Sequence, residues 1–302
     1  MCIERENTCS RKNQNNGGYS MERFTLNNGT TIPALGIGTF LMEPDDAQAA
    51  VTSALQSGYE LVDTANAYLN EKAVGRAIRN AGVSRDKVYL STKLWPSVYA
   101  KAADAIDDTL RRLQTDYIDL LFLHQPIGDT EGAYRAIEDA VQTGKIRSIG
   151  LSNFPEEELR KFAADMTVKP AVIQTEAHPY AQRKELKAYL ASIGAVLMAW
   201  YPLGHGDKAL QQEPVFKALA EKYGKSAPQI ILRWHVQNQD VVIPGSKNPD
   251  HIRANIDIFD FQLTDEEMQS IAAVNKDKTY YTATQSALEG YLAFSPDFDA
   301  QK

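Results

Sequence analysis

The sequence predicts an α/β fold, a (β/α)8 barrel of the TIM type with a β-hairpin before it and an irregular tail after it. Eight short apolar runs alternate with amphipathic stretches along the chain. Alternation of this kind is typical of a parallel sheet, and eight is the number of strands that closes a barrel. The length of 302 residues is also typical of one such barrel.

The alternative fold is an open, doubly wound sheet. That fold usually carries a Gly-x-Gly-x-x-Gly turn directly after its first strand. Residues 36–41 occupy this position and read Gly-Ile-Gly-Thr-Phe-Leu, so the third glycine is missing. The barrel is therefore favoured.

A short hairpin is expected over residues 24–32, before the barrel. Its Asn28-Gly29 pair suits the left-handed dihedral angles of a type I′ turn. The eight barrel strands are then expected at Leu35–Ile37, Leu61–Val62, Val88–Leu90, Ile118–Leu123, Ser148–Gly150, Val172–Ile173, Val196–Ala199 and Val241–Ile243.

Apolar residues spaced three and four apart predict the helices between these strands. One such stretch contains Ala102, Ile106, Leu110 and Leu113, and another contains Ala133, Ile137 and Val141. The second ends before Gly144, because a glycine commonly follows the last helical turn. Helices are also expected over residues 71–78, 215–222 and 228–236, whereas the tail over residues 276–302 is aromatic and irregular.

Composition restricts the class of protein. Hydrophobic residues make up 43% of the chain and charged residues 24%, which is typical of a soluble globular protein. The net charge of −7 argues against a nucleic acid or an anionic membrane as partner. The only cysteines are Cys2 and Cys9, so no disulfide framework is expected and a cytoplasmic location is the simplest. No apolar run is long enough to predict a transmembrane helix.

Residues 1–20 are polar and lack the apolar core of a signal peptide, which predicts a disordered extension. Residues 21–302 are then expected to form a single barrel domain that acts as a monomer. Three histidines, His178, His205 and His235, show no metal-ligand spacing, so no metal site is expected.

Four reactive side chains stand where the predicted strands end. Asp63 ends one strand and Tyr68 follows on its loop, while Lys93 and His124 end the next two strands. Each alone has a structural explanation: a loop cap, a packed aromatic ring, a solvated amine or a neutral core imidazole. Because the carboxyl ends of barrel strands carry the reactive groups of such folds, we interpret the four together as one catalytic site.

The four groups form a chemically sensible set. A phenol has a reference pKa of about 10, which is too high for easy proton exchange at neutral pH. An ammonium such as that of Lys93 favours the phenolate and lowers this pKa, and the carboxylate of Asp63 keeps the ammonium charged and in place. The imidazole of His124 can orient a carbonyl oxygen. No cysteine or serine nucleophile is evident, so an external hydride donor fits best.

Three segments resemble the signatures of the aldo-keto reductases. Residues 58–71 (Gly-Tyr-Glu-Leu-Val-Asp-Thr-Ala-Asn-Ala-Tyr-Leu-Asn-Glu) resemble the first signature, and residues 144–154 (Gly-Lys-Ile-Arg-Ser-Ile-Gly-Leu-Ser-Asn-Phe) resemble the second. The stretch from Ile243-Pro244-Gly245-Ser246 to Asn255 is similar to the third. The resemblance extends over about residues 22–275. Within the family, the chain is most similar to the prokaryotic 2,5-diketo-D-gluconate reductase branch.

The resemblance implies a barrel that binds NADP(H) and/or NAD(H) without a Rossmann motif. It makes Tyr68 the proton donor, Asp63 and Lys93 its tuning pair, and His124 the residue beside the carbonyl oxygen. The cofactor contacts that it implies are Thr39, Ser152, Asn153, Gln174, Trp200, Leu203, Gly204, Ser246, Lys247, His251 and Asn255. Among these, Ser152, Asn153 and Gln174 would hold the carboxamide, and Trp200 would stack on the nicotinamide. The implied substrate contacts are Phe40, Trp95 and His124, with Tyr280, Tyr281 and Phe294 of the tail.

The third segment departs from the family pattern at the adenine end of the cofactor. The family lysine and arginine that contact the 2′-phosphate of NADPH are replaced by Gly245 and His251, and the glutamate before Asn255 is replaced by Ala254. Loss of two fixed cations removes charge-assisted bonds of roughly 1.5–3 kcal/mol each. One interpretation is weaker NADPH preference with real use of NADH. The other is that Lys247, or Arg253, substitutes and NADPH remains preferred.

The predicted function is reversible reduction of small aldehydes, dicarbonyls or keto-sugars by NAD(P)H, with Tyr68 as general acid. Two alternatives stay open. A barrel aldolase would form a Schiff base on Lys93. A non-catalytic sensor would bind nicotinamide nucleotides without needing a tuned phenol.

Overall fold

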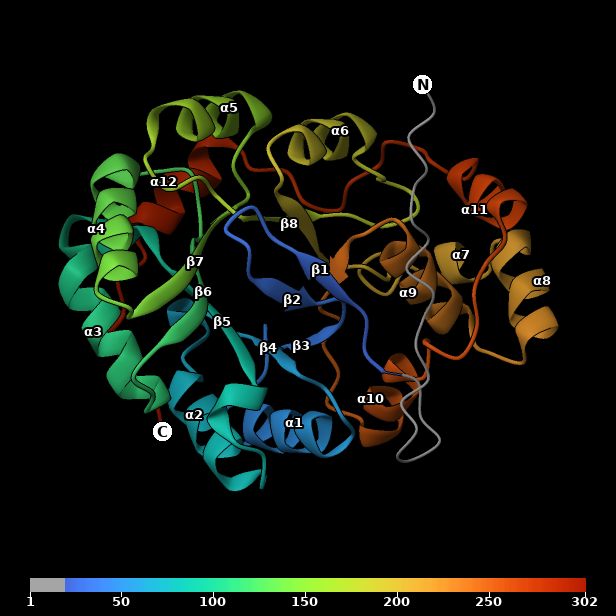
Figure 1. Ribbon diagram of the computed structural model, residues 1–302, viewed down its shortest axis with the longest axis horizontal. Helices are drawn as coiled ribbons and strands as arrows, with labels where there is room; N and C mark the ends of the chain where they lie inside the picture. The colour runs from blue at the N-terminus through green and yellow to red at the C-terminus, as the bar shows by residue number, and fades with distance from the viewer. Residues whose placement is uncertain (1–19) are drawn as a thin grey trace.

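The computed structural model describes residues 20–302, which are built around a barrel of eight parallel strands (Figure 1). The strands are β3 (Gly36–Gly38), β4 (Leu61–Asp63), β5 (Tyr89–Leu94), β6 (Ile118–Leu123), β7 (Ile146–Ser152), β8 (Val172–Glu176), β9 (Val196–Trp200) and β10 (Val241–Val242). They pair in chain order, and a parallel bridge between Leu35 and Val242 brings the last strand against the first. The predicted fold class is therefore confirmed.

Helices surround the barrel on the outside, as Figure 1 shows. The ring consists of α1 (Pro44–Gln56), α2 (Glu71–Asn80), α3 (Ala102–Leu113), α4 (Thr130–Gln142), α5 (Glu156–Asp165), α6 (Lys184–Ser192), α9 (Ala227–Gln237) and α10 (Pro249–Ile256). Additional elements are α7 (Lys208–Gln211), α8 (Pro214–Tyr223), α11 (Asp265–Ala272) and the 3-10 turns η1 (Asn66–Tyr68), η2 (Arg85–Lys87) and η3 (Pro96–Lys101). In α3, the apolar residues whose spacing predicts the helix are all buried, so this face packs on the barrel.

The hairpin of β1 (Arg23–Thr25) and β2 (Thr31–Pro33) covers the amino end of the barrel, where Leu26 and Ile32 join the apolar side chains inside it. The predicted type I′ turn is wrong. Gly29 has a φ of 80°, but Asn28 has no positive φ, and Leu26 N–H donates to the Thr30 carbonyl across a three-residue loop. Tertiary contacts explain the difference, because the Asn28 side chain donates to the Ser148 hydroxyl (2.9 Å).

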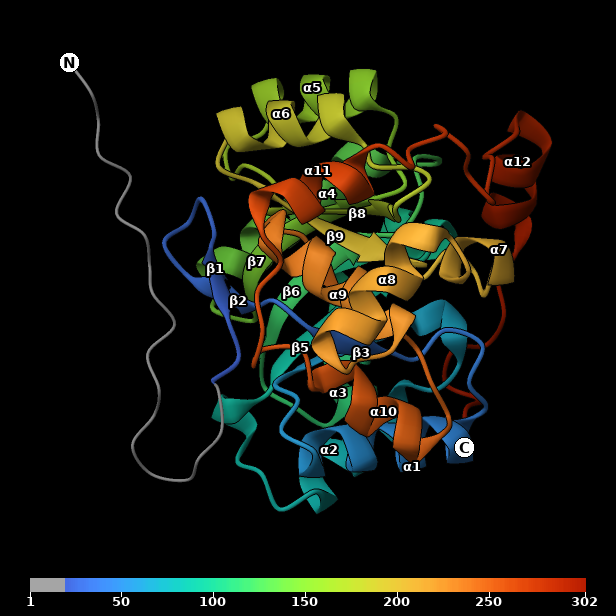
Figure 2. The same cartoon turned by 90° about the vertical axis from the view of Figure 1, so that its right-hand side faces the viewer.

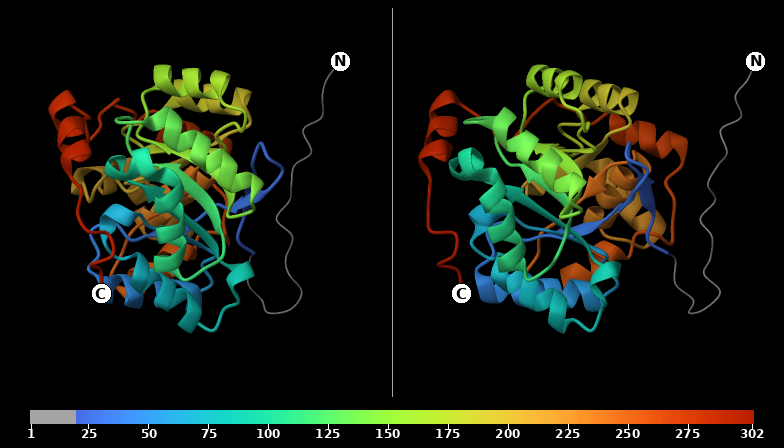
Figure 3. Two further views of the ribbon diagram at one scale, coloured as in Figure 1. Left: turned by 90° about the vertical axis from the view of Figure 1, so that its left-hand side faces the viewer. Right: turned by 60° about the vertical axis from the view of Figure 1, so that its left-hand side comes forward.

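The tail lies at the opposite, carboxyl end of the barrel from the hairpin (Figures 2 and 3). It was expected to be irregular, and this expectation is wrong over Gln285–Ala293, which form α12. The Thr284 side chain accepts a hydrogen bond from Ala287 N–H and so caps this helix. No residue of α12 is buried, so its apolar periodicity carries little signal.

The predicted disordered extension, with Cys2 and Cys9, lies outside the described residues apart from Ser20. Among residues 20–302, none of the helices combines the length and the apolar character needed to cross a bilayer.

Candidate active site

A cavity of about 800 Å³ opens at the carboxyl ends of the barrel strands. Its floor is formed by strand ends and its rim by loops and the tail. The residues predicted for the site that line it are Phe40, Asp63, Tyr68, Trp95, His124, Ser152, Asn153, Gln174, Trp200, Leu203, Ser246, Lys247, Tyr280, Tyr281 and Phe294. A site at this end of the strands is what the fold predicts.

The base of the cavity holds a buried ion pair. Asp63 ends β4 and Lys93 lies near the end of the neighbouring β5, and parallel pairing of these strands brings the two side chains together. Lys93 Nζ donates to Asp63 Oδ2 (2.5 Å) and to the Thr64 carbonyl (2.9 Å). The Lys93 side chain is 0% exposed, so it lies behind the cavity wall rather than in the lining.

The second carboxylate oxygen of Asp63 is also engaged. Its Oδ1 accepts from the Ser91 hydroxyl (2.8 Å) and from the Gln174 side-chain amide (3.1 Å). Burial lowers the pKa of the Lys93 ammonium, and the Asp63 carboxylate opposes this shift. The acceptors around the amine and the donors around the acid together hold the pair in its charged form.

Tyr68 ends the short turn η1 and stands above the ion pair. Its ring centroid lies 5.0 Å from Lys93 Nζ, and its hydroxyl makes no hydrogen bond to any described residue. Burial raises the pKa of this phenol well above its ordinary value, and the Asp63 carboxylate adds to the shift. The expectation of a net lowered pKa for this phenol is therefore wrong, because burial outweighs the effect of the Lys93 ammonium, whose hydrogen bonds go to Asp63 and Thr64.

His124 follows β6 and meets Tyr68 edge to face, with ring centroids 5.7 Å apart. Burial lowers the pKa of this imidazole well below its ordinary value, and the charge of Lys93 adds to the effect, so the ring is neutral. Its Nδ1 is buried and has no partner among the described residues. The tautomer with the proton on Nε2 avoids burying an unpaired N–H, which leaves Nε2–H free to donate into the cavity.

The next three strands contribute a polar wall. Asn153 follows β7 with a φ of 64°, an uncommon backbone geometry for a residue other than glycine. Its amide donates to the His124 carbonyl and to the Ser152 hydroxyl (both 3.1 Å) and accepts from Trp200 Nε1 (3.0 Å). The Ser152 hydroxyl donates to no described side chain, and the Gln174 amide oxygen accepts from none. These free groups face the cavity and match the donors and acceptors of a carboxamide.

Four predicted cofactor contacts are not in the cavity lining: Thr39, Gly204, His251 and Asn255. Thr39 is 0% exposed, and its hydroxyl donates to the Asp63 carbonyl (3.2 Å), so it supports the site from behind. Asn255 is buried and His251 is exposed on α10.

Several lining residues were not predicted from the sequence, among them Tyr201, Tyr291 and Gln125. A second buried acid, Glu176 at the end of β8, was also missed. Its carboxylate accepts from the backbone N–H groups of Tyr280 (2.6 Å) and Tyr281 (3.0 Å) and so holds the start of the tail over the barrel. The strand-end position of Glu176 was the available signal.

The barrel thus places a phenol, a buried amine–acid pair and a neutral imidazole at the base of one cavity. Among residues 20–302, no group of His, Cys, Asp and Glu is arranged to hold a metal ion.

Comparison with known proteins identifies the family. The model of the aldo/keto reductase family matches residues 34–276, so the chain belongs to this family, and the predicted resemblance is confirmed. The chain is 44% identical over 264 residues to morphine 6-dehydrogenase from Pseudomonas putida, with 82% of this chain and 89% of that protein covered. It is 36% identical over 256 residues to methylglyoxal reductase DkgA from Escherichia coli (strain K12), with 84% and 93% covered.

A solved structure supports the same assignment. The aldo-keto reductase of Bombyx mori in complex with NADP superposes with a TM-score of 0.82 at 32% identity, covering 88% of this chain and 96% of that one. The protein is thus an NAD(P)H-dependent enzyme that reduces carbonyl groups.

Proposed function

We propose that Tyr68 is the general acid of carbonyl reduction in this enzyme. The observation that carries the proposal is its hydroxyl, which has no partner among residues 20–302 and faces the cavity beside His124 and the buried Asp63–Lys93 pair. A raised pKa keeps the phenol protonated at neutral pH, as a proton donor must be.

The proposed mechanism assigns one task to each side chain. The His124 Nε2–H and the Tyr68 O–H donate hydrogen bonds to the substrate carbonyl oxygen and fix its position. As the carbonyl carbon gains a hydride, negative charge develops on the oxygen, and Tyr68 transfers its proton there to give the alcohol. Lys93, held by Asp63, stabilises the phenolate left behind until a solvent proton restores it.

The cavity fits a nicotinamide cofactor. Ser152 and Gln174 would hold the carboxamide through their free polar groups, and Asn153 through the second lone pair of its amide oxygen. The half-buried Trp200 would cover one face of the ring. When bound, the reduced cofactor supplies the hydride.

We further propose that NADH is a real cofactor of this enzyme beside NADPH. The two cations that could replace the missing pair, Lys247 and Arg253, are themselves paired, Lys247 with Asp46 (2.7 Å) and Arg253 with Asp250. Gly245 contributes no side chain there. A 2′-phosphate must therefore compete with carboxylates for its partners. Kinetics with both cofactors test this: kcat/KM for NADPH about a thousandfold above that for NADH would contradict it, since two lost contacts are worth about that much.

Small aldehydes, dicarbonyls and keto-sugars are the proposed substrates, and the name of the methylglyoxal reductase relative supports the dicarbonyls. The test is a screen of these three substrate groups for carbonyl-dependent oxidation of NADPH and NADH. Oxidation in at least one group is expected, and none in any group would overturn the proposal.

No observation favours the two alternatives. A Schiff base requires Lys93 to reach a substrate, but its amine is fully buried and bonded to Asp63 and Thr64. Borohydride trapping of a substrate on Lys93 would reveal an aldolase. A sensor would keep its partner response in a Tyr68→Phe variant, whereas the reductase loses turnover.

A further inference from the structure

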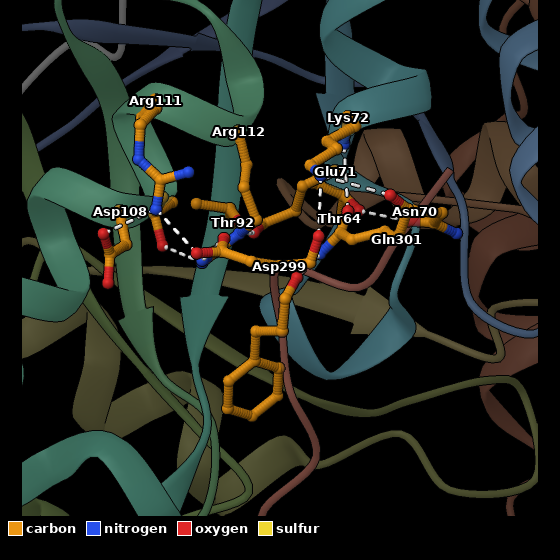
Figure 4. Close-up of polar contacts among 12 residues, drawn as sticks. Thr64, Asn70, Glu71, Lys72, Thr92, Asp108, Arg111, Arg112, Asp299 and Gln301 are labelled. Carbon is orange, nitrogen blue, oxygen red and sulfur yellow. Dashed lines mark hydrogen bonds and ion pairs between the residues drawn. The ribbon is translucent and has the colours of Figure 1, made fainter.

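The tail crosses the mouth of the cavity between two fixed points. At its start, Tyr280 and Tyr281 are held by the Glu176 carboxylate. At its end, Asp299 contacts Lys72 of α2 and Arg111 of α3, and Gln301 lies beside it (Figure 4). Between these points lies α12, which buries no side chain of its own. Apart from the contact of Tyr291 with Trp95, the position of α12 therefore depends on the two ends of the tail.

Asp299 is the centre of the second fixed point. Its Oδ1 accepts from Arg112 (3.1 Å) and its Oδ2 from Arg111 (2.7 Å), while its carbonyl accepts from Lys72 Nζ (2.6 Å). Gln301 adds a contact, because its side-chain oxygen accepts from the Lys72 N–H (3.0 Å). We call these contacts of Asp299 and Gln301 the tail latch.

The latch sits on a rigid base. The Arg112 guanidinium is almost fully buried, and its Nε donates to Glu71 Oε2 (2.6 Å). Glu71 Oε1 in turn accepts from the hydroxyl of Thr92 (2.7 Å), the neighbour of Lys93 on β5. Arg112 thus keeps a buried carboxylate partner whether or not Asp299 is present. Loss of the Asp299 charge therefore leaves no buried cation without an anionic partner, and the fold stays intact.

The latch determines where two cavity-lining rings lie. Tyr291 and Phe294 pack edge to face on Trp95, with ring centroids 5.2 Å and 5.9 Å away, and the Tyr291 carbonyl accepts from Trp95 Nε1 (2.8 Å). Asp299 follows Phe294 by five residues, so their Cα atoms can be at most about 18 Å apart. Loss of the Asp299 carboxylate contacts loosens this short connection, and with it the wall that the two rings form, while the contacts of Lys72 keep the end of the tail on α2.

We propose that Asp299 is a positioning residue for substrate binding: by latching the tail to α3 it holds Tyr291 and Phe294 against the substrate side of the cavity. The inference rests on the proposed carbonyl-reductase function of the same site. A carbonyl compound with a bulky aromatic group touches this wall, whereas a small dicarbonyl reaches Tyr68 and His124 without it. The latch therefore controls the KM of the bulky substrate and leaves kcat unchanged.

The experiment compares Asp299→Asn with wild type, using 2-naphthaldehyde as the bulky substrate and methylglyoxal as the small one. The expected result is a KM for 2-naphthaldehyde raised about tenfold, with the KM for methylglyoxal and both kcat values within about twofold, the size expected for one lost charged contact. Asp299→Glu keeps the charge and should restore most of the affinity. Asp108→Asn is the matched control, because it removes the other carboxylate bound by Arg111 (2.7 Å) without touching the tail.

Hydrogen exchange supplies a readout that is independent of turnover. In Asp299→Asn, the amides of residues 285–296 should exchange faster, while those of the barrel strands and the melting temperature stay as in wild type. Equal KM changes for both substrates, a loss of kcat, unchanged KM values, or unchanged exchange of α12 would each overturn the latch. A wild-type protein that oxidises neither NADPH nor NADH in the presence of any carbonyl compound would instead overturn the proposed function, and hydrogen exchange would still test the latch.

Discussion

The Asp63→Asn substitution removes one charge from the ion pair at the base of the site. Lys93 is 0% exposed and Asp63 2%, so neither group can be rescued by solvent where it stands. The variant leaves a buried ammonium with no anionic partner, bonded to the Thr64 carbonyl (2.9 Å) and at most to a neutral amide oxygen. Breaking a buried pair in this way costs about 3–5 kcal/mol. We expect the free energy of unfolding at pH 7 to fall by that amount, measured by urea denaturation.

The double variant Asp63→Asn/Lys93→Met separates the pair from its surroundings. Lys93→Met alone leaves the buried Asp63 carboxylate without its cation, although Ser91 and Gln174 still donate to it. With both charges removed, no uncompensated ion remains, so the double variant should be more stable than Asp63→Asn. If the destabilisation of the double variant equals the sum of the two single values, the reasoning is refuted.

The pH dependence of Asp63→Asn gives a second check. Burial lowers the pKa of Lys93 in the folded protein, and the substitution removes the carboxylate that opposes this shift. The unfolded chain, with a lysine pKa near about 10.4, then binds more protons than the folded one. Stability of the variant should therefore rise relative to wild type as the pH increases from 7 towards 10. A constant difference between the two proteins over this range would contradict the account.

Three further predictions follow from the structure. Burial lowers the pKa values of His124 and His235, so the unfolded chain binds more protons than the folded one below about pH 6.5. The free energy of unfolding should therefore fall on acidification by up to about 1.4 kcal/mol per pH unit for each imidazole. Urea denaturation from pH 7 to pH 5 measures this decline, and a constant free energy of unfolding would contradict the prediction. Gly245→Lys should raise kcat/KM for NADPH relative to NADH by roughly tenfold to a hundredfold, because it adds a charge-assisted bond to the 2′-phosphate. An unchanged ratio would argue that residue 245 does not lie beside the 2′-phosphate. Gly75→Ala should lower the free energy of unfolding by about 1–3 kcal/mol, because the added methyl group would collide with the backbone of α3. The matched helical change Gly290→Ala meets no atom within 4 Å and should be neutral or stabilising. Equal effects of the two changes would show that the α2–α3 contact is loose.

The barrel could be predicted because its strands coincide with runs of apolar residues in the sequence. β6 was expected at Ile118–Leu123 and has those bounds, since each of its residues is buried. The apolar run that predicts β5 stops at Leu90, whereas the strand continues to Leu94. Its added residues include Thr92 and Lys93, which are polar and fully buried. Apolar periodicity cannot mark such positions.

The partners of these buried polar groups come from remote parts of the chain. Lys93 is satisfied by Asp63 and Thr92 by Glu71, while Glu176 is satisfied by tail amides more than a hundred residues later. A sequence shows the groups but not which of them meet. The catalytic residues could be recognised through strand-end chemistry and family resemblance, whereas the roles of Glu176 and Asp299 depend on how the tail folds back.

The Tyr68→Phe variant tests most directly whether Tyr68 donates the proton. Its hydroxyl bonds to no described residue, so the variant should keep its stability to within about 1 kcal/mol and should bind NADPH as wild type does. Loss of a general acid should lower kcat for aldehyde reduction by about a hundredfold to ten-thousandfold. The measurement is single-turnover reduction of an aldehyde at saturating NADPH, with cofactor affinity followed by fluorescence. A Tyr68→Phe enzyme that binds NADPH and turns over within tenfold of wild type would contradict the account.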